Sequence, residues 1–164
     1  MEVVDLLDAR KVLTGKKCER NEVPEGFYRL SIHIWIINDK KQVLIQQRSS
    51  NRKMFPNMWS NTGGAALKGE TSLETVFREL KEELDIVPNI NDIELITSYK
   101  REKDFVDVYL IKNNIDINKI KLQVEEVQDV RWASIAEIEN MIQNQTFIKS
   151  SYDYFIKYLK DNGK

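Results

Sequence analysis

The sequence is poor in the residues that form disulfides, linkers and membrane spans. Its 164 residues include 1 cysteine, 1 histidine, 3 prolines and 6 glycines. The single thiol, Cys18, cannot form an internal disulfide, which is typical of a protein from a reducing compartment. The longest apolar runs, such as residues 35–37, are far shorter than the roughly 20 residues that a membrane-spanning helix needs. Acids among the first residues argue against a signal peptide, so we expect a cytoplasmic protein with no membrane partner.

An excess of charge of one sign is also missing. The chain has 25 basic and 26 acidic residues, and its formal net charge is -1. No global field would attract a nucleic-acid polymer, although a small nucleotide could still bind locally. Hydrophobic residues make up 41% of the chain, which suits a folded protein of this length, and no linker or repeat interrupts it. We predict a single domain over residues 1–164.

Hydrophobic periodicity predicts a mixture of strands and helices. Two short strands around a turn at Thr14 and Gly15 would form a hairpin within residues 1–26. Alternation predicts further strands over residues 28–37, 42–47, 93–100, 105–111 and 127–132. Helical spacing predicts a helix over residues 71–84 and two more within about 134–161, one opening at Ser134 and one over residues 148–159. This order favours an α+β fold with a mixed β-sheet and an N-terminal β-hairpin.

The helix over residues 71–84 carries an unusual group of acids. Thr71 and Glu74 form a capping-box pattern at its start. With about 100° per residue, Glu79, Glu82 and Glu83 share one flank, away from Arg78. A run of charges is ordinarily a solvated helix face. Here, however, Glu79 and Glu83 repel each other, at a cost of about 0.2–0.5 kcal/mol, and acids at a helix C-terminus oppose the macrodipole.

A divalent cation would remove both penalties. Mg²⁺ prefers oxygen ligands and is held in proteins by a few carboxylates together with substrate phosphates. The segment before the helix, residues 61–66, is small and flexible, and its glycines Gly63 and Gly64 would let the backbone approach a ligand or turn a carbonyl toward a metal. Paired glycines are more often plain turns, so this segment supports the metal site without defining it.

These residues resemble a Nudix box over residues 64–86. The pattern runs through Gly64, Glu70, the Arg78-Glu79 pair and the Glu82-Glu83 pair, with aliphatic residues at the expected positions. Asp85 departs from it, because the family has glycine there. That glycine is expected in a left-handed conformation, which aspartate can also adopt at some cost. The resemblance implies the Nudix fold, a mixed β-sheet sandwiched between α-helices.

The resemblance also implies a role for each matching residue. Glu79, Glu82 and Glu83 would bind Mg²⁺, with Mn²⁺ as an alternative, assisted by a backbone carbonyl of Gly63 or Gly64. Arg78 and Glu70 would orient these carboxylates, although an acid such as Glu70 also suits a helix N-terminus without any function. The proton of the attacking water would go to Glu79 or to a late acid, Glu125 or Glu126; an ordinary acidic turn would explain the late pair equally.

Outside the box, the N-terminal hairpin and residues 30–38 and 46–61 resemble isopentenyl-diphosphate isomerases and their hydrolase relatives. This resemblance implies that four basic residues bind the phosphates of the substrate, a role that suits arginine. Solubilising charge in loops would explain the presence of these residues equally well. They are Arg20, Arg48, Arg52 and Lys53. The isomerases need a cysteine and histidines near the box. Here the only cysteine is in the hairpin, and the only histidine, His33, lies within a strand and is interpreted as structural. The loop aromatics, Phe55 and Trp59, could stack on a base or form the wall of a pocket, but we favour core packing for both.

The sequence therefore leaves three functions to compare. The first is Mg²⁺-dependent hydrolysis of a diphosphate linkage in a nucleoside diphosphate joined to another group. The second is isomerisation of a prenyl diphosphate, which lacks its cysteine and histidines here. The third is a non-catalytic nucleotide-binding Nudix module, which would not need all three glutamates. We expect a small-molecule diphosphate as the partner, and we leave a homodimer open.

Overall fold

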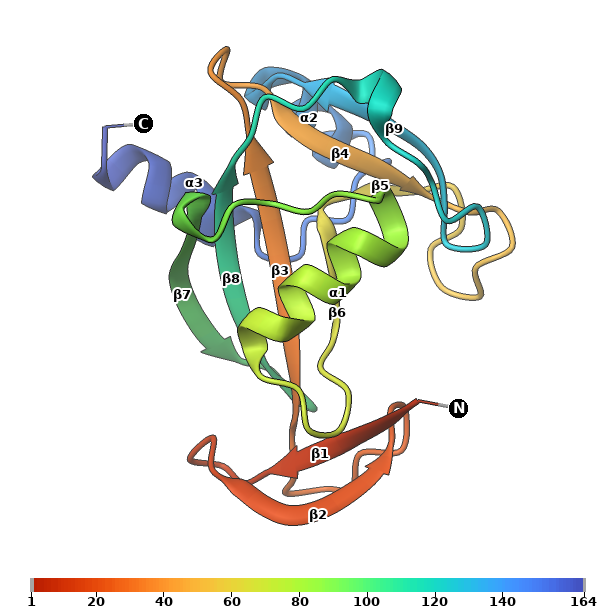
Figure 1. Ribbon diagram of the computed structural model, residues 1–164, viewed down its shortest axis with the longest axis vertical. Helices are drawn as coiled ribbons and strands as arrows, with labels where there is room; N and C mark the ends of the chain where they lie inside the picture. Colours follow the sequence, from red (N-terminus) through yellow and green to blue (C-terminus); the bar gives the residue numbers. More distant parts are fainter. Residues whose placement is uncertain (1, 164) are drawn as a thin grey trace.

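The computed structural model describes residues 2–163, in which helices cover both faces of a mixed sheet (Figure 1). An antiparallel hairpin of β1 and β2 lies beyond one end of the sheet. In chain order the strands and helices are β1 (Val3–Leu7), β2 (Leu13–Glu19), β3 (Arg29–Ile37), β4 (Val43–Arg48), β5 (Trp59–Ser60), β6 (Thr62–Ala65), α1 (Ser72–Leu84), η1 (Ile90–Asp92), β7 (Ile93–Lys100), β8 (Asp104–Lys112), η2 (Ile117–Lys119), β9 (Val127–Ala133), α2 (Ile135–Gln143) and α3 (Tyr152–Asp161).

Strand β3 is the centre of the main sheet. The strand order is β5-β4-β3-β8-β7, with β6 also paired to β3 and β9 to β4. β3 runs parallel to β8 from the pair Arg29–Asp104 to the pair Ile37–Lys112, whereas its pairings with β4 and β6 are antiparallel. The predicted mixed sheet, α+β class and N-terminal hairpin are therefore confirmed.

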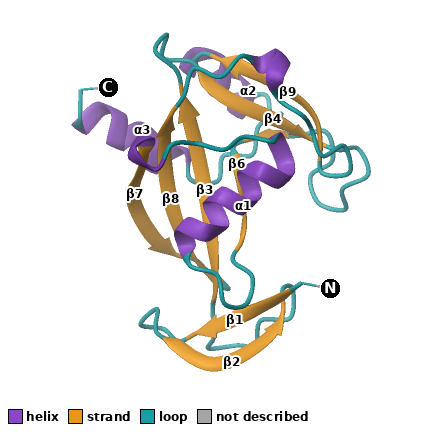
Figure 2. Cartoon of the chain, in the orientation of Figure 1, coloured by secondary structure: helices purple, strands orange, loops and turns teal. Residues whose placement is uncertain are grey.

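The two faces of β3 pack against different helices (Figure 2). Successive side chains of a strand point to opposite faces. Ile32 and Ile34 pack with Leu80 of α1 in one buried cluster. Trp35, on the other face, stacks on Phe155 of α3 with 4.7 Å between ring centroids. The side chains of β3 that face α1 and those that face α3 therefore lie on opposite sides of the strand.

Both ends of α1 follow the predicted signals. The capping box between Thr71 and Glu74 is present. At the other end Asp85 adopts the left-handed conformation, with φ 55° and ψ 40°, and the Ile86 N–H donates to Leu80 O at 3.1 Å. An ion pair between Lys81 and Asp85 accompanies this turn. Aspartate therefore closes the helix where the Nudix pattern has glycine.

Two local predictions were wrong. The hairpin does not turn at Thr14 and Gly15, which lie inside β2. Its turn is at residues 8–12, where the carboxylate of Asp8 accepts hydrogen bonds from two backbone N–H groups. The last helix begins at Tyr152, because residues 148–151 follow an irregular path. None of the helices within residues 2–163 has the length and apolar character that crossing a membrane requires.

Candidate active site

Helix α1 holds two buried carboxylates one turn apart. Glu79 and Glu83 are each only 7% exposed. Burial raises the pKa of Glu79 to about 8, and the neighbouring charge of Glu83 adds to this. Burial also raises the pKa of Glu83 to about 7, even though hydrogen bonding and nearby arginines oppose it. Two buried acids this close resist ionisation unless a cation compensates them.

Strand β6 brings bare backbone against these acids. A Cβ atom added to Gly64 would lie 2.2 Å from Glu79 Oε1, so only glycine leaves room for the carboxylate there. The sequence interpretation of residues 61–66 as a flexible segment was wrong, because Gly63 and Gly64 are paired in register with His33 and Ile32 of β3. A strand fixes the position of this backbone more firmly than a loop would.

Arg78 connects the acids of the site to one another. Its Nε donates to Glu70 at 2.6 Å, and its Nη1 donates to Glu79 at 3.0 Å and to Glu82 at 3.2 Å. Its Nη2 also donates to the carbonyl of Ala65. Burial alone would raise the pKa of Glu70, but these bonds lower it overall. The prediction that the carboxylates lie away from Arg78 was wrong, because Arg78 and Glu82 are an i,i+4 pair on the same side of the helix.

Sequence reasoning missed two residues that position Glu83. Gln46 of β4 donates from Nε2 to Glu83 Oε2 at 3.2 Å. Thr62 of β6 donates to Gln46 Oε1 at 2.8 Å, which fixes the direction of the amide. Both side chains are buried. The available signal was Gln46, a polar residue at a strand position that the alternation predicts to be buried. The alternation alone does not show which helix this side chain faces.

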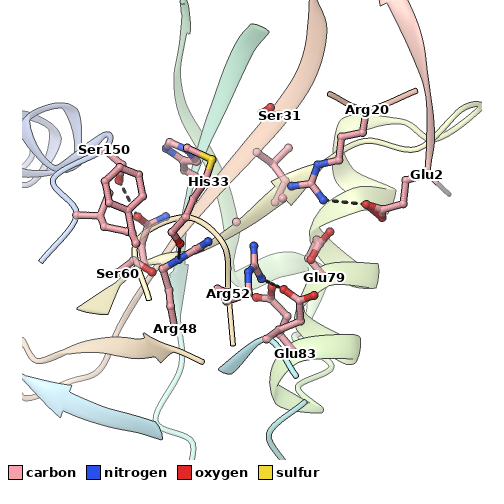
Figure 3. A pocket seen from close by; sticks show the side chains of 18 of the residues that line it. Glu2, Arg20, Ser31, His33, Arg48, Arg52, Ser60, Glu79, Glu83 and Ser150 are labelled. Atoms are coloured by element: carbon pink, nitrogen blue, oxygen red, sulfur yellow. Dashed lines mark hydrogen bonds and ion pairs between the residues drawn. The ribbon is translucent and has the colours of Figure 1, made fainter. Parts of the chain in front are cut away.

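A cleft of about 1080 Å³ opens beside these acids (Figure 3). The hairpin and the loop after β4 supply part of its lining, and Glu79 and Glu83 supply another part. All four predicted phosphate-binding cations line it: Arg20, Arg48, Arg52 and Lys53. Arg20 pairs with Glu2, while Arg48 donates from Nε to the Met54 carbonyl. The structure thus brings the predicted cations and acids together in one cavity.

The late acids also line this cleft. Glu126 forms an ion pair with Arg52, whereas Glu125 makes no hydrogen bond or ion pair within residues 2–163. Of the two aromatic residues, Trp59 packs against the core as expected. The same interpretation of Phe55 was wrong, because this residue is 52% exposed and lines the cleft.

Comparison with known proteins gives the family. A family model described as the NUDIX domain matches residues 27–156. The chain belongs to the Nudix family. An uncharacterized Nudix hydrolase of Listeria monocytogenes is 38% identical over 150 residues, covering 90% of this chain and 89% of that protein. An isopentenyl-diphosphate Delta-isomerase of Shigella flexneri is 25% identical over 146 residues, covering 84% and 79%. The crystal structure of DR0079 from Deinococcus radiodurans has a TM-score of 0.78 at 20% identity, covering 95% of this chain and 98% of that chain.

As a Nudix hydrolase, this chain acts on acid anhydrides in phosphorus-containing compounds, and enzymes of this family generally use divalent metal ions. The only cysteine, which an isomerase would need at the site, is not there. Cys18 is absent from the cleft lining among residues 2–163, and burial raises the pKa of its thiol. His33 does line the cleft, but burial lowers its pKa to about 4, so the imidazole is neutral at physiological pH.

The carboxylates are not yet arranged around a metal. Within residues 2–163, no three histidine, cysteine, aspartate or glutamate side chains are close enough together to hold an ion, because Arg78 holds Glu79 and Glu82 while Gln46 holds Glu83. The donor set nevertheless fits a divalent cation. It offers hard oxygen ligands, and burial raises the pKa of two of these carboxylates, Glu79 to about 8 and Glu83 to about 7. Rotation of the side chains could bring them together.

Proposed function

We propose that this chain is a Mg²⁺-dependent hydrolase that cleaves the diphosphate linkage of a nucleoside diphosphate joined to another group. The products would be a monophosphate and a second phosphorylated compound. The observation that carries this proposal is the pair of buried acids, Glu79 and Glu83, packed beside the bare backbone of Gly64 and opening on a cleft lined with cations. The cleft volume of about 1080 Å³ suits a ligand of nucleotide size.

The metal-binding residues would be Glu79, Glu82 and Glu83, with the carbonyl of Gly64 as a further ligand; Mn²⁺ could replace Mg²⁺. A bound ion would neutralise the phosphate oxygens and activate water. Glu82 has a side chain 49% exposed, so it can turn from Arg78 at little packing cost. Arg78, which also binds Glu70, would keep the Glu79 carboxylate oriented when the ion binds.

The remaining residues would bind substrate and move a proton. Arg48 and Arg52 offer planar donor groups that match phosphate oxygens in pairs, and Arg20 and Lys53 add positive charge at the same cleft. Glu125, which lines the cleft and has no partner within residues 2–163, would accept the water's proton. Glu126 is a weaker candidate for this role because Arg52 already binds it. Glu79, once ionised, is the alternative base.

A panel of diphosphate compounds incubated with Mg²⁺, with the products resolved by mass, tests this proposal. We expect cleavage between the two phosphorus atoms of at least one nucleoside diphosphate derivative. Double-bond migration in a prenyl diphosphate without phosphate release would instead establish an isomerase. Tight nucleotide binding with no turnover at any metal tested would establish a binding module.

A further inference from the structure

The two ring nitrogens of His33 have different surroundings. Nδ1 lies 2.8 Å from Ser151 Oγ, whereas Nε2 has no partner within residues 2–163. In that part of the chain, Arg29 Nε is the only buried side-chain nitrogen or oxygen without a hydrogen bond. Nε2 is therefore open to the cleft that His33 lines (Figure 3).

The position of the imidazole hydrogen follows from the partners of Ser151. Trp35 Nε1 is 2.9 Å from the same Ser151 Oγ, and an indole N–H can only donate. Ser151 is 0% exposed, so its own hydroxyl hydrogen cannot bond to bulk water. The remaining acceptor is His33 Nδ1. Ser151 therefore donates to Nδ1, and the hydrogen of the neutral ring lies on Nε2, where it points into the cleft.

Helix α3 lacks the usual side-chain hydrogen bond at its N-terminus. Ser151 is the N-cap residue of α3, a position at which a serine oxygen usually accepts a hydrogen bond from a backbone N–H of the first turn. No such bond is present here, because the hydroxyl is shared between Trp35 and His33. A buried hydrogen-bond network of this kind fixes the orientation of its members.

A short stretch of bare backbone separates His33 from the acids of α1. A Cβ atom at Gly63 would lie 3.3 Å from His33 Cδ2, and one at Gly64 would lie 2.2 Å from Glu79 Oε1. Neighbouring residues of a strand face opposite sides, so His33 and Glu79 lie on opposite faces of β6, although both line the same cleft. A ligand that passes the glycine backbone of β6 within this cleft can therefore contact the carboxylates with one end and His33 with the other.

The groups around the His33 side of the cleft are mostly donors. Arg29 and Arg101 line the same cleft, and the charge of Arg101 acts on His33. Asp104 is the acid nearby, but Arg101 binds both of its carboxylate oxygens, at 2.8 and 2.7 Å, and Ser31 donates to it at 2.8 Å. This chemistry selects an anionic oxygen acceptor.

We propose that His33 binds substrate by donating from Nε2–H to an oxygen of the phosphoryl group farther from the acids of α1. The diphosphate would then extend within the cleft from the acids of α1, past the glycine backbone of β6, to His33. This inference rests on the proposed function, because it needs a diphosphate in the cleft. It assigns His33 a role in binding that its interpretation as a purely structural residue did not include.

Nitrogen NMR of the imidazole tests the proposal directly. His33 is the only histidine in the chain, so ¹⁵N signals from a histidine-labelled sample report on this ring alone. We expect the Nε2–H tautomer in the free protein, and a shift of Nε2 and its proton when inorganic pyrophosphate with Mg²⁺ reaches saturation. An Nδ1–H tautomer, or an Nε2 signal that does not move at saturation, would overturn the proposal.

Two substitutions separate binding by His33 from its structural bond. Asn at position 33 can accept from Ser151 at the place of Nδ1 but cannot reach as far as Nε2, whereas Gln can place a donor near Nε2 but loses the bond to Ser151. We expect His33→Asn to weaken pyrophosphate binding about tenfold or more with little change in Tm. His33→Gln should lower Tm and keep most of the affinity. Unchanged affinity in His33→Asn, or equal losses in both variants, would contradict the proposal.

The outcomes also distinguish this inference from the proposed function. A response of His33 to pyrophosphate, without turnover in the diphosphate panel, would support the binding role and overturn the hydrolase assignment. Turnover in the panel, together with no change in the His33 signals at saturating pyrophosphate, would support the hydrolase assignment and overturn the binding role of His33.

Discussion

Gly64 lies so close to Glu79 that a Cβ atom at Gly64 would fall 2.2 Å from the Glu79 carboxylate oxygen and 2.3 Å from its carboxyl carbon. Strand β6 and helix α1 can make this approach only because one partner has no side chain. The contact brings a buried acid against the bare backbone of β6, and a buried carboxylate is unfavourable unless a partner or a cation compensates its charge. The first prediction follows from this contact.

Gly64→Ala should disturb the site more than the fold. The added methyl group meets the end of the Glu79 side chain, which can move aside, and Gly64 does not have a positive φ, so alanine suits its backbone. We expect a Tm close to that of the wild type and a loss of Mg²⁺-dependent turnover of about tenfold or more, since small misplacements of site groups are costly. Gly69→Ala is the matched control. Gly69 has φ +86° and no neighbour within 4 Å, so this variant should lose stability and keep its turnover.

Removing charge from the proposed metal ligands should abolish activity without unfolding the chain. We expect Glu82→Gln and Glu83→Gln each to reduce Mg²⁺-dependent turnover by orders of magnitude, because the ion would lose a ligand. Circular dichroism and Tm should remain near wild type. Glu102→Gln, at an exposed turn, is the control and should leave turnover unchanged. Full activity in both site variants would remove these residues from the metal site.

The metal-free protein should lose stability as pH rises through neutrality. The pKa of Glu79 is raised from 4.5 to about 8, and that of Glu83 from 4.5 to about 7. Between the unfolded pKa of 4.5 and these folded values, the folded state therefore binds more protons than the unfolded state. The free energy of unfolding must then fall as pH increases. His33, with its pKa lowered to about 4, gives the opposite slope below about 6.5, so the informative range is about pH 6.5–8.5.

Thermal denaturation across that range measures this effect. We expect the Tm of the metal-free wild type to decrease with pH, and saturating Mg²⁺ to remove most of the decrease by binding the ionised form. The double variant Glu79→Gln, Glu83→Gln should show a flatter profile without metal. A wild-type profile parallel to that of the double variant would show that these acids do not hold protons in the folded state.

Asp85 offers a separate prediction about stability. Its φ of 55° is left-handed, a conformation in which an L residue is strained and glycine is not. We expect Asp85→Gly to raise Tm by about 2–4 °C, with turnover unchanged, because the exposed ion pair with Lys81 contributes little. Asparagine can also adopt the left-handed conformation but has no charge, so the Tm of Asp85→Asn should be close to that of the wild type. A lower Tm in Asp85→Gly would mean that the Lys81 pair matters more than the strain.

Local rules predicted most of the fold because the elements have strong patterns. The alternation in residues 28–37 and the capping box at Thr71 are signals of short range, and both elements are present. The hairpin turn was misplaced because Gly15 has a positive φ within a strand, and a glycine is read as a turn when only its neighbours are known. The parallel pairing of β3 and β8 joins residues about 75 positions apart, and short-range patterns carry no information about it.

The candidate site was predicted less completely than the fold. The spacing of Glu79, Glu82 and Glu83 located the acids, and the structure places the predicted cations in the same cleft. Arg78 was wrongly placed away from these acids, since Arg78 and Glu82 are an i,i+4 pair and lie only about 40° apart on a helical wheel. Gln46 and the bond between Ser151 and His33 were missed because these partners come from distant strands and loops.

The central claim is that α1 and Gly64 together form a divalent metal site, and a crystal structure with Mn²⁺ tests it most directly. Anomalous scattering locates Mn²⁺ independently of the carboxylate positions. The account predicts an ion bound by Glu79, Glu82 and Glu83 beside the Gly64 carbonyl, with Glu82 turned away from Arg78. An ion bound elsewhere, with these acids still held by Arg78 and Gln46, would contradict it.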